Sequence, residues 1–242
     1  MFGMDLAVGD HFWLGLLEII GINIILSGDN AVVIALPCRN LADGVRNKAI
    51  IAGSIGAIVL RIVFSLFIVY LLDVPYLKLV GSLLLLWIGV KLLIPEDEVH
   101  GDKIKAGHNI WSAVQTVIIA DAVMSLDNVI AIAAAAHGHV LLIVIGLVIS
   151  VPLIIFGSTI MLKVLLRFPI LVMFGGGLLG WIAGEIFLTD PALAGYVENL
   201  PHWTELAAKI LGAAFVVGLG KYLAYRMSAK KRLVDLAEGN PS

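Results

Sequence analysis

The stretch "ADAVMSLDNVIAIA" at residues 120–133 decides the kind of fold that this chain adopts. It places Asp121, Asp127 and Asn128 inside a run of small and aliphatic residues. The chain has 242 residues, 60% of them hydrophobic and 14% charged, whereas a soluble domain carries roughly 25% charged residues. The apolar residues gather in continuous runs, and about 20 such residues form a helix that spans a bilayer. The sequence therefore predicts an all-α, polytopic membrane protein.

The apolar runs predict seven transmembrane helices. We expect them at residues 11–36, 49–72, 76–94, 110–136, 140–165, 169–188 and 205–227. Prolines mark several of the ends, as expected where a helix stops or starts: Pro37, Pro75, Pro95 and Pro169. Aromatic residues suited to the membrane–water boundary flank the same runs: Phe12, Trp13, Tyr70, Tyr76, Trp111 and Trp203.

The basic residues predict the orientation of the chain. One set of flanks holds Arg39, Arg46, Lys48, Lys91, Lys103, Lys105, Lys163, Arg167, Arg226, Lys230, Lys231 and Arg232. The other set holds only Lys78 and Lys209. Because cytoplasmic loops carry the excess of lysine and arginine, we expect the N-terminus outside and the C-terminus in the cytoplasm.

The chain contains an internal repeat. After a shift of 98 residues, "INIILSGDNAVVIA" at residues 22–35 lies on residues 120–133, so that serine, aspartate and asparagine match. A second pair, "GSLLLLWIG" at residues 81–89 and "GGGLLGWIA" at residues 175–183, shares glycine, leucine, tryptophan and isoleucine. With three helices per copy, the second copy is expected to be inverted in the membrane. Inverted repeats are common in secondary transporters, whose binding sites lie near the midplane at the repeat interface.

The repeat predicts the organisation of the chain. We expect a first repeat at residues 1–94, a cytoplasmic linker at 95–109 and a second repeat at 110–188. Residues 189–242 then form one additional helix and a basic C-terminal tail.

The repeated polar residues share faces of their helices. Asn23, Ser27 and Asn30 are spaced i, i+4, i+7, and Asp121, Ser125 and Asn128 repeat this spacing; Asp29 and Asp127 lie one residue to the side. A single aspartate in mid-membrane costs about 2.5–3.5 kcal/mol on insertion scales, so several carboxylates need compensation by protons, an arginine or a bound cation. Carboxylate and amide oxygens are hard ligands that suit Mg²⁺, Ca²⁺ or Mn²⁺. We therefore expect a divalent metal site formed by Asp29, Asn30, Asp121, Asp127 and Asn128, with support from Asn23, Ser27 and Ser125.

Three further ionisable residues lie within the expected spans: Glu18, Arg61 and Glu185. Arg61 can neutralise one carboxylate and is expected to be a structural counter-ion rather than a mobile gate. Glu18 and Glu185 are candidates for gating or proton coupling, and a position at a wet boundary of the membrane is an equal alternative for both.

"GDNAVVIA" and "DAVMSLDNVIAIAAA" together resemble the TerC family of integral membrane proteins, and the resemblance covers essentially the whole chain. It implies transport of divalent cations, chiefly export of Mn²⁺, in a bacterial plasma membrane, with an association by name to tellurium resistance. The acidic motif residues that it carries onto this chain are Asp29, Asn30, Asp121, Asp127 and Asn128.

The expected function is metal export with protons as the natural counter-ion, because carboxylates in apolar surroundings can exchange a proton for a metal. The expected partners are the lipid bilayer and the metal ion, with no nucleic acid, and a homo-oligomer stays open. Export of a small organic solute or a tellurium species is the alternative. We do not expect an enzyme. An intramembrane protease with paired aspartates carries a Gly-x-Gly-Asp run, and here Leu26 occupies the position of its first glycine, two residues before Gly28. A protein that only binds partners is disfavoured, because Arg61 alone cannot balance three carboxylates.

Overall fold

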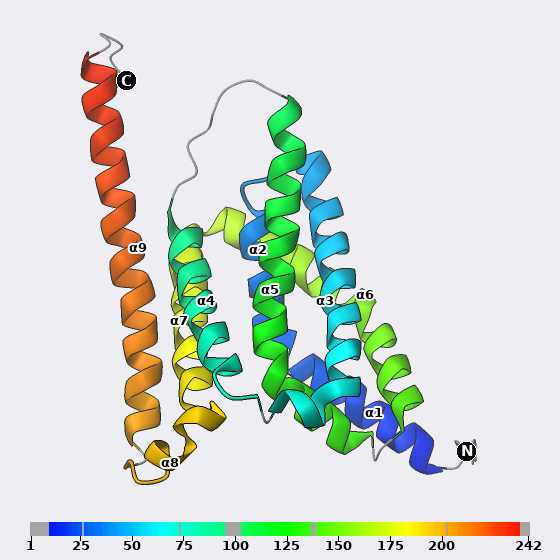
Figure 1. Cartoon of the computed structure of the whole chain (residues 1–242). Helices are drawn as coiled ribbons and strands as arrows, with labels where there is room; N and C mark the ends of the chain where they lie inside the picture. Colours follow the sequence, from blue (N-terminus) through cyan, green and yellow to red (C-terminus); the bar gives the residue numbers. More distant parts are fainter. Residues whose placement is uncertain are drawn as a thin grey trace. The chain divides into compact units, whose positions relative to one another are not determined.

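The computed structural model describes residues 10–25, 27–72, 74–94, 103–136, 139–201 and 203–237, which form helices and connections without any strand. The helices in chain order are α1 (Asp10–Ile25), α2 (Ser27–Cys38), α3 (Asp43–Leu72), α4 (Leu77–Leu93), α5 (Lys103–Ala135), α6 (Val140–Arg167), α7 (Ile170–Leu188), η1 (Pro191–Leu193), α8 (Ala194–Val197) and α9 (Trp203–Ala237) (Figure 1). The all-α prediction is confirmed for this part of the chain.

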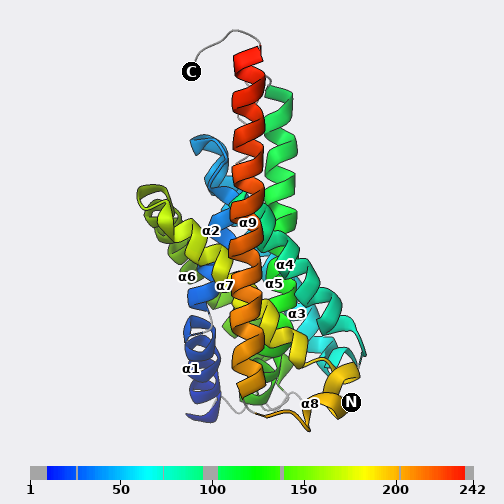
Figure 2. The same ribbon diagram turned by 90° about the vertical axis from the view of Figure 1, so that its left-hand side faces the viewer.

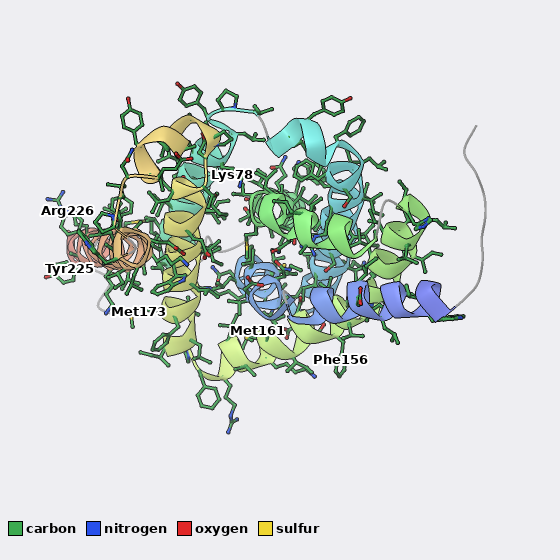
Figure 3. All side chains as sticks on the ribbon, turned by 90° about the horizontal axis from the view of Figure 1, so that it is seen from below. Lys78, Phe156, Met161, Met173, Tyr225 and Arg226 are labelled. Atoms are coloured by element: carbon green, nitrogen blue, oxygen red, sulfur yellow. The ribbon has the colours of Figure 1, made fainter. Side chains whose placement is uncertain are left out.

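The predicted spans agree with the helices at most ends. The expected spans at 76–94, 140–165 and 169–188 correspond to α4, α6 and α7 within two residues at each end. The expected span at 11–36 differs, because it is covered by two described helices, α1 and α2, which run in different directions (Figures 1 and 3). Segments of α3, α6, α7 and α9 are long and apolar enough to cross a membrane, and α2 and α5 contain shorter apolar segments. The count of seven spans stays a prediction.

The outer faces of the helices are apolar. Phe67 on α3, Phe156 on α6, Phe174 on α7 and Leu211 on α9 are all more than half exposed. Figure 3 shows Phe156 pointing away from the ribbon of α6. Exposed apolar surface of this extent is typical of proteins that face lipid or other apolar partners. The apolar exterior therefore agrees with a bilayer environment.

The chain divides into two compact units. The first, unit 1, comprises residues 1–74 and 106–164 and holds α1, α2, α3, most of α5 and most of α6. The second, unit 2, comprises residues 75–105 and 165–242 and holds α4, α7, α8 and α9. Neither unit corresponds to one half of the sequence, because each takes helices from both expected repeats.

Unit 2 is built on a close approach of α7 and α9, which Figure 2 shows with α9 in front of α7. A Cβ atom at Gly180 would lie 2.3 Å from the carbonyl oxygen of Gly212, and one at Gly184 would lie 2.2 Å from that of Ala208. Small residues of this kind allow helix backbones to touch in a membrane. Gly180 and Gly184 therefore serve the packing of α7 against α9.

A buried aspartate fixes the start of α4 in unit 2. Asp190 accepts hydrogen bonds from the backbone N–H groups of Tyr76 (2.9 Å), Leu79 (3.0 Å) and Ala192 (2.8 Å). Tyr76 has a φ of 67°, in the left-handed region that residues other than glycine seldom adopt. Burial acts to raise the pKa of Asp190, but the backbone donors, Leu79 first, outweigh it and hold the pKa below its ordinary value.

Candidate metal site in unit 1

A buried ion pair joins α3 to α5 in unit 1. Arg61 Nη2 lies 2.7 Å from Asp121 Oδ1, and Arg61 Nε donates to Ser125 Oγ at 3.0 Å. The Ser125 hydroxyl donates in turn to Asp121 Oδ2 at 3.1 Å. Arg61 is 1% exposed and Asp121 3% exposed. Each carboxylate oxygen of Asp121 thus has a partner, as a buried charge requires.

Local sequence explains why these three groups meet. Asp121 and Ser125 are one turn apart on α5, so their side chains share a face. On α3, Gly53 and Gly56 present no side chain, and a Cβ atom at either would lie within 3 Å of Val117 or Ile118 on α5. The two helices can therefore approach closely enough for a guanidinium on α3 to reach a carboxylate on α5.

The first D-N motif lies in the same unit on α2. Asp29 is half-buried in the first turn of α2, and its Oδ1 accepts a hydrogen bond from the Asn30 N–H at 2.8 Å. Asp29 lies close enough to Arg61 and Asp121 to interact electrostatically with both. Asn30 is buried, with 1% exposure. The structure therefore joins Arg61, Asp121 and Ser125 by direct contacts and places Asp29 within electrostatic range of the ion pair, with Asn30 buried next to Asp29 in the chain.

The second D-N motif is only partly described. Asn128 is half-buried on α5, seven residues beyond Asp121 and on the same face. The side chains of Asp127, Asn23 and Ser27 lie outside the described part of the chain, although their backbones belong to α5, α1 and α2. Among the side chains that are described, no three of the His, Cys, Asp and Glu type converge as a metal cluster.

The two glutamates of the expected spans have separate surroundings. Glu18 is exposed on α1 in unit 1. Glu185 belongs to unit 2, where Lys209 Nζ lies 3.0 Å from its Oε1 and 2.7 Å from Glu205 Oε1. Gating or proton coupling by these residues stays a prediction, and Glu185 has an ion-pair partner that sequence reasoning did not name. The i, i+4 spacing of Glu205 and Lys209 signals the ion pair within α9 and not the contact of Lys209 with Glu185.

The structure shows two buried serines that the sequence did not single out. Ser54 on α3 and Ser158 on α6 are fully buried, and their hydroxyl groups have no hydrogen-bond partner among the described residues. Ser54 lies seven residues before Arg61 on the same face of α3. Ser158 follows Gly157, which faces Ala31 on α2, one residue beyond Asn30. Composition alone gives no signal for such residues, because serine is common where membrane helices meet.

Comparison with known proteins decides the family. The model of the integral membrane protein TerC family matches residues 8–228. The chain belongs to the TerC family. Within it, this TerC protein is 43% identical over 207 residues to the uncharacterized membrane protein YjbE of Bacillus subtilis, covering 85% of this chain and 93% of YjbE. It is 27% identical over 241 residues to the uncharacterized membrane protein YkoY of the same organism, covering 89% of this chain and 74% of YkoY.

No solved structure matches the chain significantly. Membership of the family makes this TerC protein an integral membrane protein, in agreement with its apolar exterior. Both matched motifs, "SGDNA" and "SLDNV", fall inside the family match.

Proposed function

We propose that this TerC protein is a membrane transporter that exports divalent metal cations through a carboxylate and amide site in unit 1. The observation that carries the proposal is the buried ion pair of Arg61 and Asp121, with the Asp29 carboxylate within electrostatic range of both, inside a unit whose outer surface is apolar. Ionisable groups are costly inside a membrane and usually mark a substrate or ion pathway.

The proposed ligands are Asp29, Asn30, Asp121, Asp127 and Asn128, with Asn23, Ser27 and Ser125 in support. All supply hard oxygen atoms, which bind Mn²⁺, Ca²⁺ and Mg²⁺ in preference to softer ions. We propose Mn²⁺ as the substrate, since the resemblance to the family implies it, with Ca²⁺ and Mg²⁺ as competitors. Cys38 is buried on α2 and is the only cysteine of the chain, so a thiolate cluster would have no second member.

The composition of the two units supports the proposed inverted repeat. Unit 1 contains α1, α2 and α3 from the first expected repeat with α5 and α6 from the second. Unit 2 contains α4 and α7, which hold the second pair of matching segments, and these two helices pack together. Corresponding helices of the two repeats therefore lie in the same unit. Alternating access by movements of such pseudo-symmetric parts is the usual mode of secondary transporters.

We propose export as the direction of transport, since the resemblance to the family implies it. With the basic flanks in the cytoplasm, the N-terminus lies outside the plasma membrane, and export carries the metal from the cytoplasm to that side. We propose protons as the counter-ion, because inward proton movement can drive export of a cation that shares the same carboxylates.

The alternative substrate, a small organic solute, is less well supported by the geometry. A zwitterion would need a cation for its carboxylate, and Arg61 is already bound to Asp121 and Ser125. The metal proposal uses the carboxylates that are present, whereas the organic-solute proposal needs a cation that is occupied.

The test is the metal content of cells that express the chain under excess Mn²⁺. Wild type is expected to lower cellular Mn, and Asp121→Asn, which keeps the volume but removes the charge, is expected not to. Asp43→Asn is the matched control, because Asp43 lies exposed at the start of α3. Immunoblots of membranes check that all variants are present in equal amounts. If wild type changes the content of no divalent metal while present in the membrane, metal export is contradicted.

A further inference from the structure

We propose that Arg61 is a tethered cation that occupies the metal-binding carboxylate between transport cycles and excludes monovalent cations from it. This inference rests on the proposed function, because it concerns the same site. In the structure, the Arg61 guanidinium binds Asp121 Oδ1 and the Ser125 hydroxyl binds Oδ2. Both oxygen atoms that a metal would use on Asp121 are therefore already bound to the protein.

The charge of Arg61 is permanent. A guanidinium group does not lose its proton in proteins, so a change of pH cannot remove this positive charge. Arg61 is also buried, so water does not screen it from a second cation nearby. A metal ion bound to Asp121 would lie close to the buried guanidinium, and the two positive charges would repel each other with little screening. In the exchange proposal, metal entry therefore displaces the side chain of Arg61, which couples substrate binding to a movement inside unit 1.

Competition of this kind discriminates by charge. Na⁺ or K⁺ brings the same single charge as the guanidinium and lacks its directed hydrogen bonds, so exchange gains nothing. A divalent ion brings twice the charge and can interact with Asp29 as well as Asp121. Asp29 lies within electrostatic range of both members of the ion pair, so its carboxylate adds attraction for a divalent ion in the same unit. In this proposal, Arg61 prevents the abundant monovalent ions from binding Asp121 and gives way only to a divalent ion.

A fixed structural bridge is the opposing account of the same ion pair. In that account Arg61 holds α3 against α5 in every state, and its removal would weaken the site without freeing a ligand. The two accounts differ in sign: exchange predicts tighter metal binding when Arg61 is removed, and a fixed bridge predicts equal or weaker binding.

The experiment measures equilibrium binding of radioactive Mn²⁺ to the purified full chain in lipid nanodiscs. Binding is measured in two buffers of equal ionic strength, one with K⁺ and one with the bulky choline cation as the monovalent ion. Wild type is compared with Arg61→Gln and Arg61→Lys. Arg46→Gln is the matched control, since Arg46 lies on the same helix and pairs with the exposed Asp43. We expect Arg61→Gln to bind Mn²⁺ more tightly by roughly tenfold or more, the scale of coupling between two ligands.

The expected pattern also includes selectivity. Binding to wild type and Arg46→Gln should be equal in K⁺ and in choline, whereas K⁺ should weaken binding to Arg61→Gln. Arg61→Lys keeps the charge without the planar fork and should have an intermediate affinity. If Arg61→Gln does not yield monodisperse protein, Arg61→Lys decides by the same comparison.

Equal or weaker Mn²⁺ binding by folded Arg61→Gln, or binding that K⁺ does not affect, would overturn the exchange proposal and leave the proposed function intact. If wild type and every variant bind no divalent cation, the proposed function fails first. Whether wild type binds a divalent cation therefore distinguishes failure of the proposed function from failure of the exchange proposal.

Discussion

The ion pair between Arg61 and Asp121 is the residue-scale feature on which the account depends. Removing one partner of a buried pair leaves an uncompensated charge, and this is usually worse than removing both. The sequence predicted that Arg61 neutralises one carboxylate. It did not predict which one, because Asp29, Asp121 and Asp127 all lie in comparable apolar runs. Only the close approach of α3 and α5 selects Asp121.

A double-mutant cycle measures this coupling. Asp121→Asn alone is expected to cost about 3–5 kcal/mol of stability, because Arg61 stays buried without its carboxylate. The double variant Arg61→Gln with Asp121→Asn is expected to be more stable than the sum of the single changes, by about 0.5–3 kcal/mol. Apparent unfolding temperatures in detergent give the comparison. The same cycle on Arg46 and Asp43, an exposed pair, should show coupling near zero. Additive effects at Arg61 and Asp121 would show that the pair is not formed.

Asp190 gives a residue-scale prediction with a pH dependence. Its pKa is held below the ordinary value of 3.8, so the stabilisation is present above that value and is lost as pH falls through the lower folded pKa. In Asp190→Asn, an NH₂ group replaces one carboxylate oxygen and cannot accept a hydrogen bond. At least one backbone N–H group therefore loses its acceptor, and we expect the free energy of unfolding at neutral pH to fall by about 1–3 kcal/mol. Below about pH 4, the apparent unfolding temperature of the variant should also change less with pH than that of wild type. Parallel pH curves for the two proteins would refute this role of Asp190.

At the scale of elements, the contact between α7 and α9 depends on small residues. A methyl group at Gly212 would lie 2.1 Å from the carbonyl oxygen of Gly180, and a backbone atom cannot move aside as a flexible side chain can. Gly218 lies on the same helix, and nothing lies within 4 Å of a Cβ atom placed there. The two glycines therefore form a matched pair, one packed and one open.

We predict that Gly212→Ala destabilises the protein by about 1–3 kcal/mol, the usual scale of overpacking. Gly218→Ala should be neutral or more stable by up to about 1 kcal/mol, because alanine favours the helix. Apparent unfolding temperatures of the purified variants check both. A Gly212→Ala protein as stable as Gly218→Ala would show that α7 and α9 are not in backbone contact.

Helix positions were predictable at this scale, and their grouping was not. Long apolar runs and flanking prolines locate α4, α6 and α7 closely, because bilayer thickness sets the length of a span. The first span was predicted as one helix, since apolar composition is continuous through residues 11–36 and does not reveal the change of direction between α1 and α2. The partner of Glu185 was missed as well, because it is supplied by α9, far away in sequence.

At the scale of the whole molecule, sequence halves and compact units differ. The repeat groups residues 1–94 against residues 110–188, whereas contacts group α4 with α7 and α9. A repeat records similarity between segments and carries no information on which copies touch. The candidate site is found within unit 1, where α2 and α5 supply one polar motif each. The proposed ligands come from the repeat and stay a prediction, and Arg61 was named from the sequence as a counter-ion; the packing of α3 against α5 was needed to select Asp121 as its partner.

The proposed orientation is also a whole-molecule prediction. Green fluorescent protein fused after residue 242 should fluoresce in bacterial cells, and alkaline phosphatase at the same position should be inactive, because the basic flanks place the C-terminus in the cytoplasm. The opposite pair of results would contradict the proposed orientation.

If divalent metal crosses the membrane through the unit 1 site, the purified chain should carry Mn²⁺ into sealed proteoliposomes. The purified chain is reconstituted with a Mn²⁺-sensitive dye inside the vesicles, beside Asp127→Asn and the control Asp43→Asn. We predict flux through wild type and the control, and loss of flux in Asp127→Asn. Absence of Mn²⁺, Ca²⁺ and Mg²⁺ flux through reconstituted wild type, or undiminished flux through Asp127→Asn, would contradict the account.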